Sequence, residues 1–113
     1  QALLDAHPEI SAVLTGAYRI TLGVLSAINS KNLLIPRDIS VFGFDIMDIA
    51  DVLPFRLTGI HIPTEEVAEA LAEIMMKRIN SELTVPSFKG VVELGFVEGS
   101  SLRRKEDVNE LFK

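Results

Sequence analysis

Short apolar runs and one stretch of helical periodicity organise the first half of the chain. Residues 12–15 are apolar and partly β-branched and end at Gly16, which predicts a buried strand. Residues 19–31 are apolar over about three turns, which predicts a helix buried on more than one face. The run 39–44 predicts a second strand. A strand, a helix and a strand with short connections form a βαβ unit, so we expect a parallel sheet with a right-handed crossover.

The second half of the chain predicts two further strands and the clearest helix. Residues 57–62 and 90–97 have the composition of short strands. Between them, apolar residues recur at steps of three and four, which predicts a helix that begins at a capping Thr64. The stretch 46–52, which mixes aspartates with apolar residues, predicts a short helix before the third strand.

The composition narrows the class of protein. The chain has 113 residues, with 11 Lys and Arg against 16 Asp and Glu, so its net charge is −5. Because it has no cysteine, it forms no disulfide and no thiolate metal site. Its apolar runs are far shorter than the roughly 20 residues of a membrane helix. Its acidic balance argues against binding a phosphate backbone, which needs clustered Lys and Arg. The first residues have the pattern of a helix end stopped by Pro8, so we expect a fragment of a longer protein.

Motifs for enzymatic or metal chemistry are absent from the sequence. It contains no Gly-rich phosphate loop and no nucleophile elbow of the form G-x-S-x-G. His7 and His61 lie far apart in the sequence, and we expect both to be structural. Asp45, Asp48 and Asp51 recur at steps of three, along one side of a short helix, but without the spacing of a calcium loop. We therefore expect no catalytic residue, no metal site and no cofactor.

Three short segments follow the predicted parallel strands, at the edge where ligands bind in sheets of this kind. They are 16–18, Asp45 and Ile62. A carboxylate after an apolar strand needs hydrogen-bond donors. The hydroxyls of a sugar or nucleoside supply them, because a carboxylate accepts two hydrogen bonds side by side. A cap on the following short helix, or a bond to a loop amide, is an equal alternative for Asp45. Tyr18 either stacks on a ligand ring or packs at the edge of the core.

The stretch IPRDISVFGFD at 35–45 closely resembles the signature VPxDVSVxGFDD of LacI/GalR-type transcription regulators. Other segments resemble that family in the same order and spacing: LGVLSAI at 22–28, LTGIHIP at 57–63, the helix at 66–80 and EGSS at 98–101. The resemblance covers residues 2–101, nearly the whole chain. The sequence is therefore similar to the C-terminal part of the effector-binding region of such a regulator.

The resemblance implies an α/β fold of the periplasmic-binding-protein-like type I class, a three-layer α/β/α arrangement around a parallel sheet, present here as a fragment. In that family two lobes close on a small molecule, and the chain crosses between them three times. We expect residues 1–61 in the C-terminal lobe and 62–89 in the crossover and helix of the N-terminal lobe. Residues 90–101 would then form the closing strand back to the C-terminal lobe, followed by a polar tail at 102–113.

The resemblance also implies a set of effector-binding residues, from which this chain departs in part. Asp45 matches the family's aspartate that binds effector hydroxyls. Ala17 and Tyr18 stand where family members commonly have Asn-Asp, so the amide that usually orients the ligand is missing. Ile62 replaces a polar residue, usually Gln, and leaves the pocket more apolar. These departures predict an altered ligand, or a regulator that senses none.

A homodimer through the C-terminal lobe is a further implication of the resemblance. The family uses the helix that matches 19–31 and the short helix that precedes the third strand. The apolar residues that we expect at the interface are Leu22, Leu25, Val52 and Leu53. For Leu25, a place in the core of its own chain is an equal alternative.

The function implied by the resemblance is the sensing of a small molecule, a sugar or a related compound. Its binding between the lobes would shift a population of conformations that controls operator binding. Such a protein is a cytoplasmic regulator rather than an enzyme, has no membrane partner, and contacts DNA only through a helix-turn-helix upstream of this stretch. The alternative is a sugar-binding protein of a transport system with the same fold, which needs a secretory leader upstream. An enzyme of the flavodoxin-like class needs a phosphate loop or a catalytic pair, which the sequence lacks.

Overall fold

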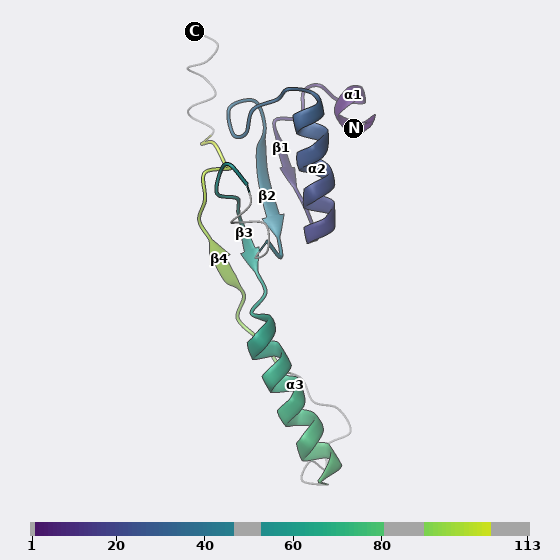
Figure 1. The fold of residues 1–113 in the computed structure, drawn as a ribbon, viewed down its shortest axis with the longest axis vertical. Coiled ribbons are helices and arrows are strands. Elements are labelled where there is room, and N and C mark those ends of the chain that lie inside the picture. Colours follow the sequence, from purple (N-terminus) through teal and green to yellow (C-terminus); the bar gives the residue numbers. More distant parts are fainter. Residues whose placement is uncertain (1, 47–52, 81–89, 105–113) are drawn as a thin grey trace. The chain divides into compact units, whose positions relative to one another are not determined.

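The computed structural model describes residues 2–46, 53–80 and 90–104 (Figure 1). The chain divides into two compact units. Unit 1 consists of Gln1–His61 together with Phe96–Lys113, and unit 2 consists of Ile62–Gly95. The chain therefore leaves unit 1 after His61 and re-enters it at Phe96. The assignment of these units to the lobes of a larger protein stays a prediction.

Helices and strands alternate through most of the described chain. In order they are α1 (Ala2–Ala6), β1 (Ala12–Leu14), α2 (Tyr18–Ser30), β2 (Ser40–Phe44), β3 (Thr58–His61), α3 (Thr64–Ile79) and β4 (Gly95–Val97). The strand–helix–strand unit predicted from the apolar pattern is present as β1, α2 and β2. The short helix predicted over 46–52 lies, except for its first residue, outside the described residues.

The strands form one sheet in the order β1-β2-β3-β4. β1 pairs with β2 in parallel, with Val13 beside Val41, and β2 pairs with β3 in parallel, with Gly43 beside Gly59. The β1–β2 ladder continues one residue past β1, where the Thr15 N–H donates to the Phe42 carbonyl at 2.9 Å. The predicted parallel pairing is therefore confirmed, and the carboxyl ends of three neighbouring strands meet at one edge of the sheet.

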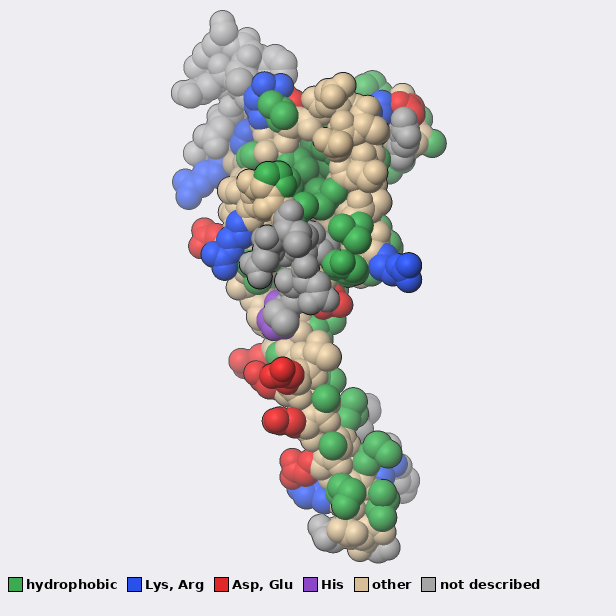
Figure 2. Space-filling view, in the orientation of Figure 1, with side chains coloured by type: hydrophobic (Ala, Val, Ile, Leu, Met, Phe, Trp, Pro, Cys, Tyr) green, Lys and Arg blue, Asp and Glu red, His purple; other side chains and the backbone are tan. Residues whose placement is uncertain are grey.

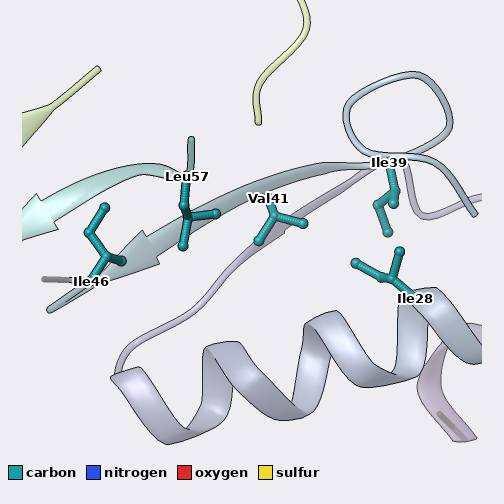
Figure 3. Packing of buried hydrophobic residues seen from close by; sticks show 5 residues of the cluster. All are labelled: Ile28, Ile39, Val41, Ile46 and Leu57. Atoms are coloured by element: carbon teal, nitrogen blue, oxygen red, sulfur yellow. The ribbon is translucent and has the colours of Figure 1, made fainter. Parts of the chain in front are cut away.

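Five aliphatic side chains form the core of unit 1, between α2 and one face of the sheet (Figure 3). They are Ile28, Ile39, Val41, Ile46 and Leu57, each at most 1% exposed. Burial of such a side chain contributes about 1.5–3 kcal/mol. Figure 3 shows Ile28 reaching from α2 toward Ile39 and Val41 of the sheet. This contact explains why α2 packs along β2 and places its first turn at the carboxyl edge of the sheet.

The segment that returns to unit 1 is held by a buried hydroxyl. The Ser101 Oγ donates to the Val41 carbonyl at 2.6 Å and accepts from the Thr58 N–H at 2.8 Å. The Val41 N–H in turn donates to the Ser101 carbonyl at 3.0 Å. One serine therefore ties the returning chain to both β2 and β3. The next described residues also contact the unit, since the Arg103 N–H donates to the Ser40 hydroxyl at 3.1 Å.

Two sequence predictions about element ends are wrong. The final strand occupies only Gly95–Val97 rather than 90–97, and Val91 is 96% exposed, so the residues before Gly95 have neither a ladder nor a core to join. Thr64 does not cap α3, because it is already the first helical residue and Pro63 takes the cap position without a side-chain bond. The Thr64 hydroxyl instead donates back to the Ile62 carbonyl at 3.3 Å.

The end of α2 agrees with the sequence prediction. Asn32 has a φ of 55°, in the left-handed region that Asn tolerates, and its N–H donates to the Asn29 carbonyl at 2.9 Å. The helix therefore stops within one residue of the end predicted at 31, and the chain turns toward β2.

Unit 2 is dominated by α3, which has no buried residue. Four of its large apolar side chains are exposed: Leu71, Met75, Met76 and Ile79. Figure 2 shows apolar and acidic side chains together on the visible face of this helix. No helix in the described part of the chain is long and apolar enough to cross a membrane.

Candidate functional site

The candidate site is the carboxyl edge of the unit 1 sheet, which we define as residues 15–18, 45–46 and 60–61. The register places Phe44 of β2 beside Ile60 of β3, so the residues that follow each of them lie at the same edge. β1 ends at the same side, and its continuation leads directly into α2. This parallel arrangement brings together segments that are far apart in the sequence.

Asp45 lies where the chain turns off the end of β2. Its φ is 59°, a left-handed conformation that Asp adopts more readily than most residues. Its N–H donates to the Ile60 carbonyl at 2.8 Å, and the Ile46 N–H reaches the same oxygen at 3.3 Å. The backbone of Asp45 is thus fixed against β3 at the carboxyl edge.

The Asp45 carboxylate is half-buried, and no side-chain hydrogen bond among the described residues uses it. It therefore keeps its capacity to accept hydrogen bonds from a ligand. The alternative from the sequence, a cap on the following helix, concerns residues 47–52, which lie outside the described residues.

Ala17 and Tyr18 form the junction between β1 and α2. Ala17 is extended, with φ −164° and ψ 152°, and it occupies the cap position without a side-chain hydrogen bond. Its carbonyl accepts from the Thr21 N–H at 3.0 Å. Tyr18 is the first helical residue and is half-buried. The first turn of α2 therefore faces the carboxyl edge with no acidic or capping side chain of its own.

A buried pair of threonines fixes this junction, and sequence reasoning missed it. The Thr15 and Thr21 hydroxyl oxygens lie 2.6 Å apart. Thr15 can also donate to the Phe42 carbonyl at 3.2 Å, and Thr21 to the Ala17 carbonyl at 3.1 Å. The two hydroxyl protons are thus shared among three close oxygen–oxygen contacts. These contacts connect α2 to both β1 and β2. The pair positions Ala17 and Tyr18 relative to the sheet.

His61, the last residue of β3, carries a buried nitrogen without a hydrogen-bond partner. The atom is Nδ1, and it is the one buried side-chain polar atom without a partner among the described residues. The sequence assigned His61 a structural role, because a single histidine in a strand gives no signal of unmet hydrogen bonding. Ile62, predicted to line the pocket, directly follows it and is half-buried.

Two of the four residues predicted for the dimer interface line an apolar groove of unit 1. Leu25 and Leu53 line this groove, which has a volume of about 480 Å³. Its other lining residues are Ile28 and Asn29 of α2, residues 33–35 of the loop after it, Pro54 and Phe55. Both leucines also pack against the core, which is the alternative place considered for Leu25, and the role of either in a dimer stays a prediction. Leu22 is 41% exposed one turn earlier on α2, and Val52 lies outside the described residues.

In the described part of unit 1, the titratable groups with a shifted pKa lie just before β2. The Arg37 guanidinium and the Leu34 N–H both hydrogen-bond Asp38 and lower the pKa of its carboxyl. This pair precedes β2, at the opposite edge of the sheet. Among the described residues, no group of three or more His, Asp or Glu side chains could hold a metal ion.

Comparisons with known proteins show which domain family the chain matches. Residues 1–102 match the family model of the periplasmic binding protein-like domain. The ribose operon repressor of Escherichia coli (strain K12) is 35% identical over 77 residues, which are 67% of this chain and 23% of the repressor. The HTH-type transcriptional repressor PurR of Vibrio atlanticus (strain LGP32) is 35% identical over 80 residues, which are 71% of this chain and 24% of the repressor. The chain thus spans about a quarter of the length of these relatives.

A solved structure described as a transcriptional regulator CelR–cellobiose complex is similar in fold. It superimposes with a TM-score of 0.80 at 27% sequence identity, and the match covers 88% of this chain and 30% of that chain. The similarity extends through both units of the described structure.

Proposed function

Because the chain belongs to the periplasmic binding protein-like domain family, in the form found in LacI/GalR-type regulators, we propose that it is part of the effector-sensing region of a DNA-binding transcription regulator. The family and the α/β fold expected from the sequence are confirmed. The proposed effector is a small polyhydroxylated molecule that binds at the carboxyl edge of unit 1. Its binding favours one conformation of the full-length protein and so changes the affinity for operator DNA.

The observation that carries this proposal is the placement of Asp45. A carboxylate fixed at the end of a parallel strand, without a side-chain hydrogen bond among the described residues, is suited to accept hydrogen bonds from two neighbouring hydroxyls. The relatives point to the same chemistry, since one is a ribose operon repressor and another was solved with cellobiose. A sugar is therefore the first class of effector to test.

Three further residues adapt the proposed site. Ala17 supplies no polar group, and Tyr18 supplies an aromatic face and a hydroxyl at the start of α2. Ile62, the first residue of unit 2, stays an apolar contact predicted from the sequence. Together they favour a ligand that offers an apolar ring face as well as hydroxyls, because a tyrosine ring stacks well on such a face.

The proposal includes a homodimer and a cytoplasmic protein. A second copy would cover the groove lined by Leu25 and Leu53 together with the exposed Leu22. DNA contact belongs to a helix-turn-helix outside this chain, which fits the net charge of −5 here. The mechanism needs no covalent step, so no catalytic residue is proposed.

The variant Asp45→Asn tests the site without disturbing the backbone. Asn tolerates the left-handed conformation of residue 45 as well as Asp does, so the variant removes charge and little else. Calorimetric titration of the full-length protein with D-ribose, cellobiose and adenosine measures the effect. We expect the bound ligand to lose affinity by about tenfold or more, since hydrogen bonds to a charged group contribute about 1.5–3 kcal/mol.

The matched control is Asp5→Asn, at an exposed aspartate of α1, which should leave the affinity unchanged. Wild-type protein that binds none of the three compounds would contradict the proposal for this class of effector. Equal affinity of wild type and Asp45→Asn would contradict the assignment of the site.

A further inference from the structure

In the described part of unit 1, the buried polar side-chain atoms have hydrogen-bond partners with one exception. The buried hydroxyls of Thr15, Thr21, Ser40 and Ser101 all take part in hydrogen bonds. The exception among the described residues is the His61 Nδ1 atom, which is buried and has no partner. Leaving a buried donor or acceptor unpaired costs about 1–3 kcal/mol. Among the described residues, His61 Nδ1 is therefore the buried side-chain atom that still lacks a hydrogen-bond partner.

His61 lies at the same edge of the sheet as Asp45. The β2–β3 ladder ends with Phe44 beside Ile60, and Asp45 and His61 directly follow these two residues in the sequence. The Asp45 N–H donates to the Ile60 carbonyl, and this hydrogen bond holds the segments that follow β2 and end β3 together. His61 therefore belongs to the same carboxyl edge as the proposed effector-binding carboxylate.

The chemistry of the two groups is complementary. An ionised carboxylate only accepts hydrogen bonds, whereas an imidazole Nδ1 donates or accepts according to its tautomer. A hydroxyl can do both, so it can pair with Nδ1 in either tautomer. A ligand with several hydroxyls can thus satisfy Asp45 with one and His61 with another.

We infer that His61 is a second effector-binding residue, whose Nδ1 hydrogen-bonds a hydroxyl of the ligand beside Asp45. The inference rests on the proposed function and adds to it a residue that the family resemblance did not assign. It also gives the unpaired nitrogen a role, because the cost of leaving it unpaired is recovered when the ligand binds.

A pair of amide variants separates the two ring nitrogens of His61. Asn places a polar atom close to the position of Nδ1, and Gln places one close to the position of Nε2. In titrations of the full-length protein with D-ribose and cellobiose, His61→Asn should bind within about threefold of wild type, and His61→Gln should lose about tenfold or more. The reverse order, or equal affinity of all three proteins, would overturn the inference.

A third variant separates binding from folding. His61→Leu removes an unpaired buried polar atom, so the ligand-free protein should melt at the same temperature or higher, while its affinity falls by about tenfold. If His61→Leu lowers both the melting temperature and the affinity, or does not fold, His61 has a structural partner and the inference is wrong.

The two proposals fail in different ways. If wild type binds neither sugar, the proposed sugar effector is wrong and the inference about His61 falls with it. If Asp45→Asn loses affinity but His61→Gln and His61→Leu do not, the proposed function stands and only the role of His61 is refuted.

Discussion

The turn before β2 is organised by one carboxylate. Asp38 accepts a hydrogen bond from the Leu34 N–H at 2.8 Å, and its own N–H donates to the Leu34 carbonyl at 2.7 Å. Arg37 reaches both carboxylate oxygens, from Nε at 2.9 Å and from a terminal nitrogen at 3.0 Å. The hydrogen bond from Arg37 is the larger cause that holds the pKa of Asp38 below its usual value, and the Leu34 N–H adds to it.

This shift predicts a pH dependence of stability with a defined sign. Because the pKa of Asp38 is lower in the folded protein, the ionised carboxylate stabilises the fold above its unfolded pKa, and this contribution is lost as the pH falls through the folded value. Asp38→Asn should therefore lower the melting temperature at neutral pH, by at most about 2 °C for so exposed a pair. The difference from wild type should shrink as the pH falls below about 4 and vanish below the folded pKa of Asp38. Calorimetry between pH 7 and 3 measures it, and a difference that is constant across this range would contradict the prediction.

Single residues were only partly predictable. Asp45 could be proposed from sequence because a carboxylate directly follows an apolar strand, and the structure adds its left-handed backbone. The Thr15–Thr21 pair could not be foreseen, since its members meet only after α2 folds back on the sheet. His61 gave no signal either, because the lack of a partner is a property of three-dimensional packing.

At the level of elements, β2 and β3 depend on two facing glycines. Gly43 and Gly59 pair across the two strands, on a face that Ile46 covers. A Cβ atom at Gly43 would overlap the Ile46 Cγ2 atom and lie 3.0 Å from the Leu57 Cδ2 atom. Both side chains belong to the fully buried core, so neither can move aside easily.

Two alanine substitutions should therefore have opposite effects on stability. Gly43→Ala should reduce the free energy of unfolding by about 1–3 kcal/mol through overpacking. Gly23→Ala, within α2, meets no atom within 4 Å and should stabilise by about 0.5–1 kcal/mol because alanine favours the helix. Urea unfolding of the full-length protein compares them. A stable Gly43→Ala protein would show that the core accommodates the extra methyl group.

Element prediction succeeded where periodicity is strong. The apolar patterns of α2 and α3 and the apolar runs of β1, β2 and β3 identified their types, and the parallel pairing followed from the strand–helix–strand order. The predicted burial was wrong for β1, where Leu14 is 75% exposed, and for α2, where Ile20 and Leu22 are exposed and only Thr21 and Ile28 are buried. The last strand was predicted too long, because the apolar residues before Gly95 resemble a strand although no ladder extends over them. Local pattern does not reveal whether a partner strand is available.

At the level of the whole molecule, the division into two units was expected only from the family resemblance. Composition alone indicated one small domain, whereas the chain forms two units joined after His61 and before Phe96. A helix such as α3, with exposed Leu71 and Ile79, is amphipathic in sequence whether or not a core is present to cover it. The number of units is therefore a property of connectivity, which hydrophobic pattern does not encode.

The proposed homodimer depends on one side of α2. Leu22 is 41% exposed and lies one turn before Leu25, which lines the apolar groove with Leu53. Ile20, also on α2, is 57% exposed. Because it lies two residues before Leu22 and a helix turns about 100° per residue, it is on nearly the opposite side of α2. It lines a different groove, with a volume of about 320 Å³, between α2 and α1. The two residues thus offer a matched pair, both exposed and aliphatic, on opposite sides of one helix.

Glutamate at each position tests which side associates. Leu22→Glu places a charge at the proposed interface, where its desolvation is costly, so the full-length protein should change from dimer to monomer in sedimentation experiments at micromolar concentration. Ile20→Glu should remain a dimer. Because both side chains are largely exposed, neither change should lower the melting temperature of a monomer by more than a few degrees. Dissociation by Ile20→Glu alone would move the interface to the groove beside α1, and a wild-type monomer would exclude the homodimer.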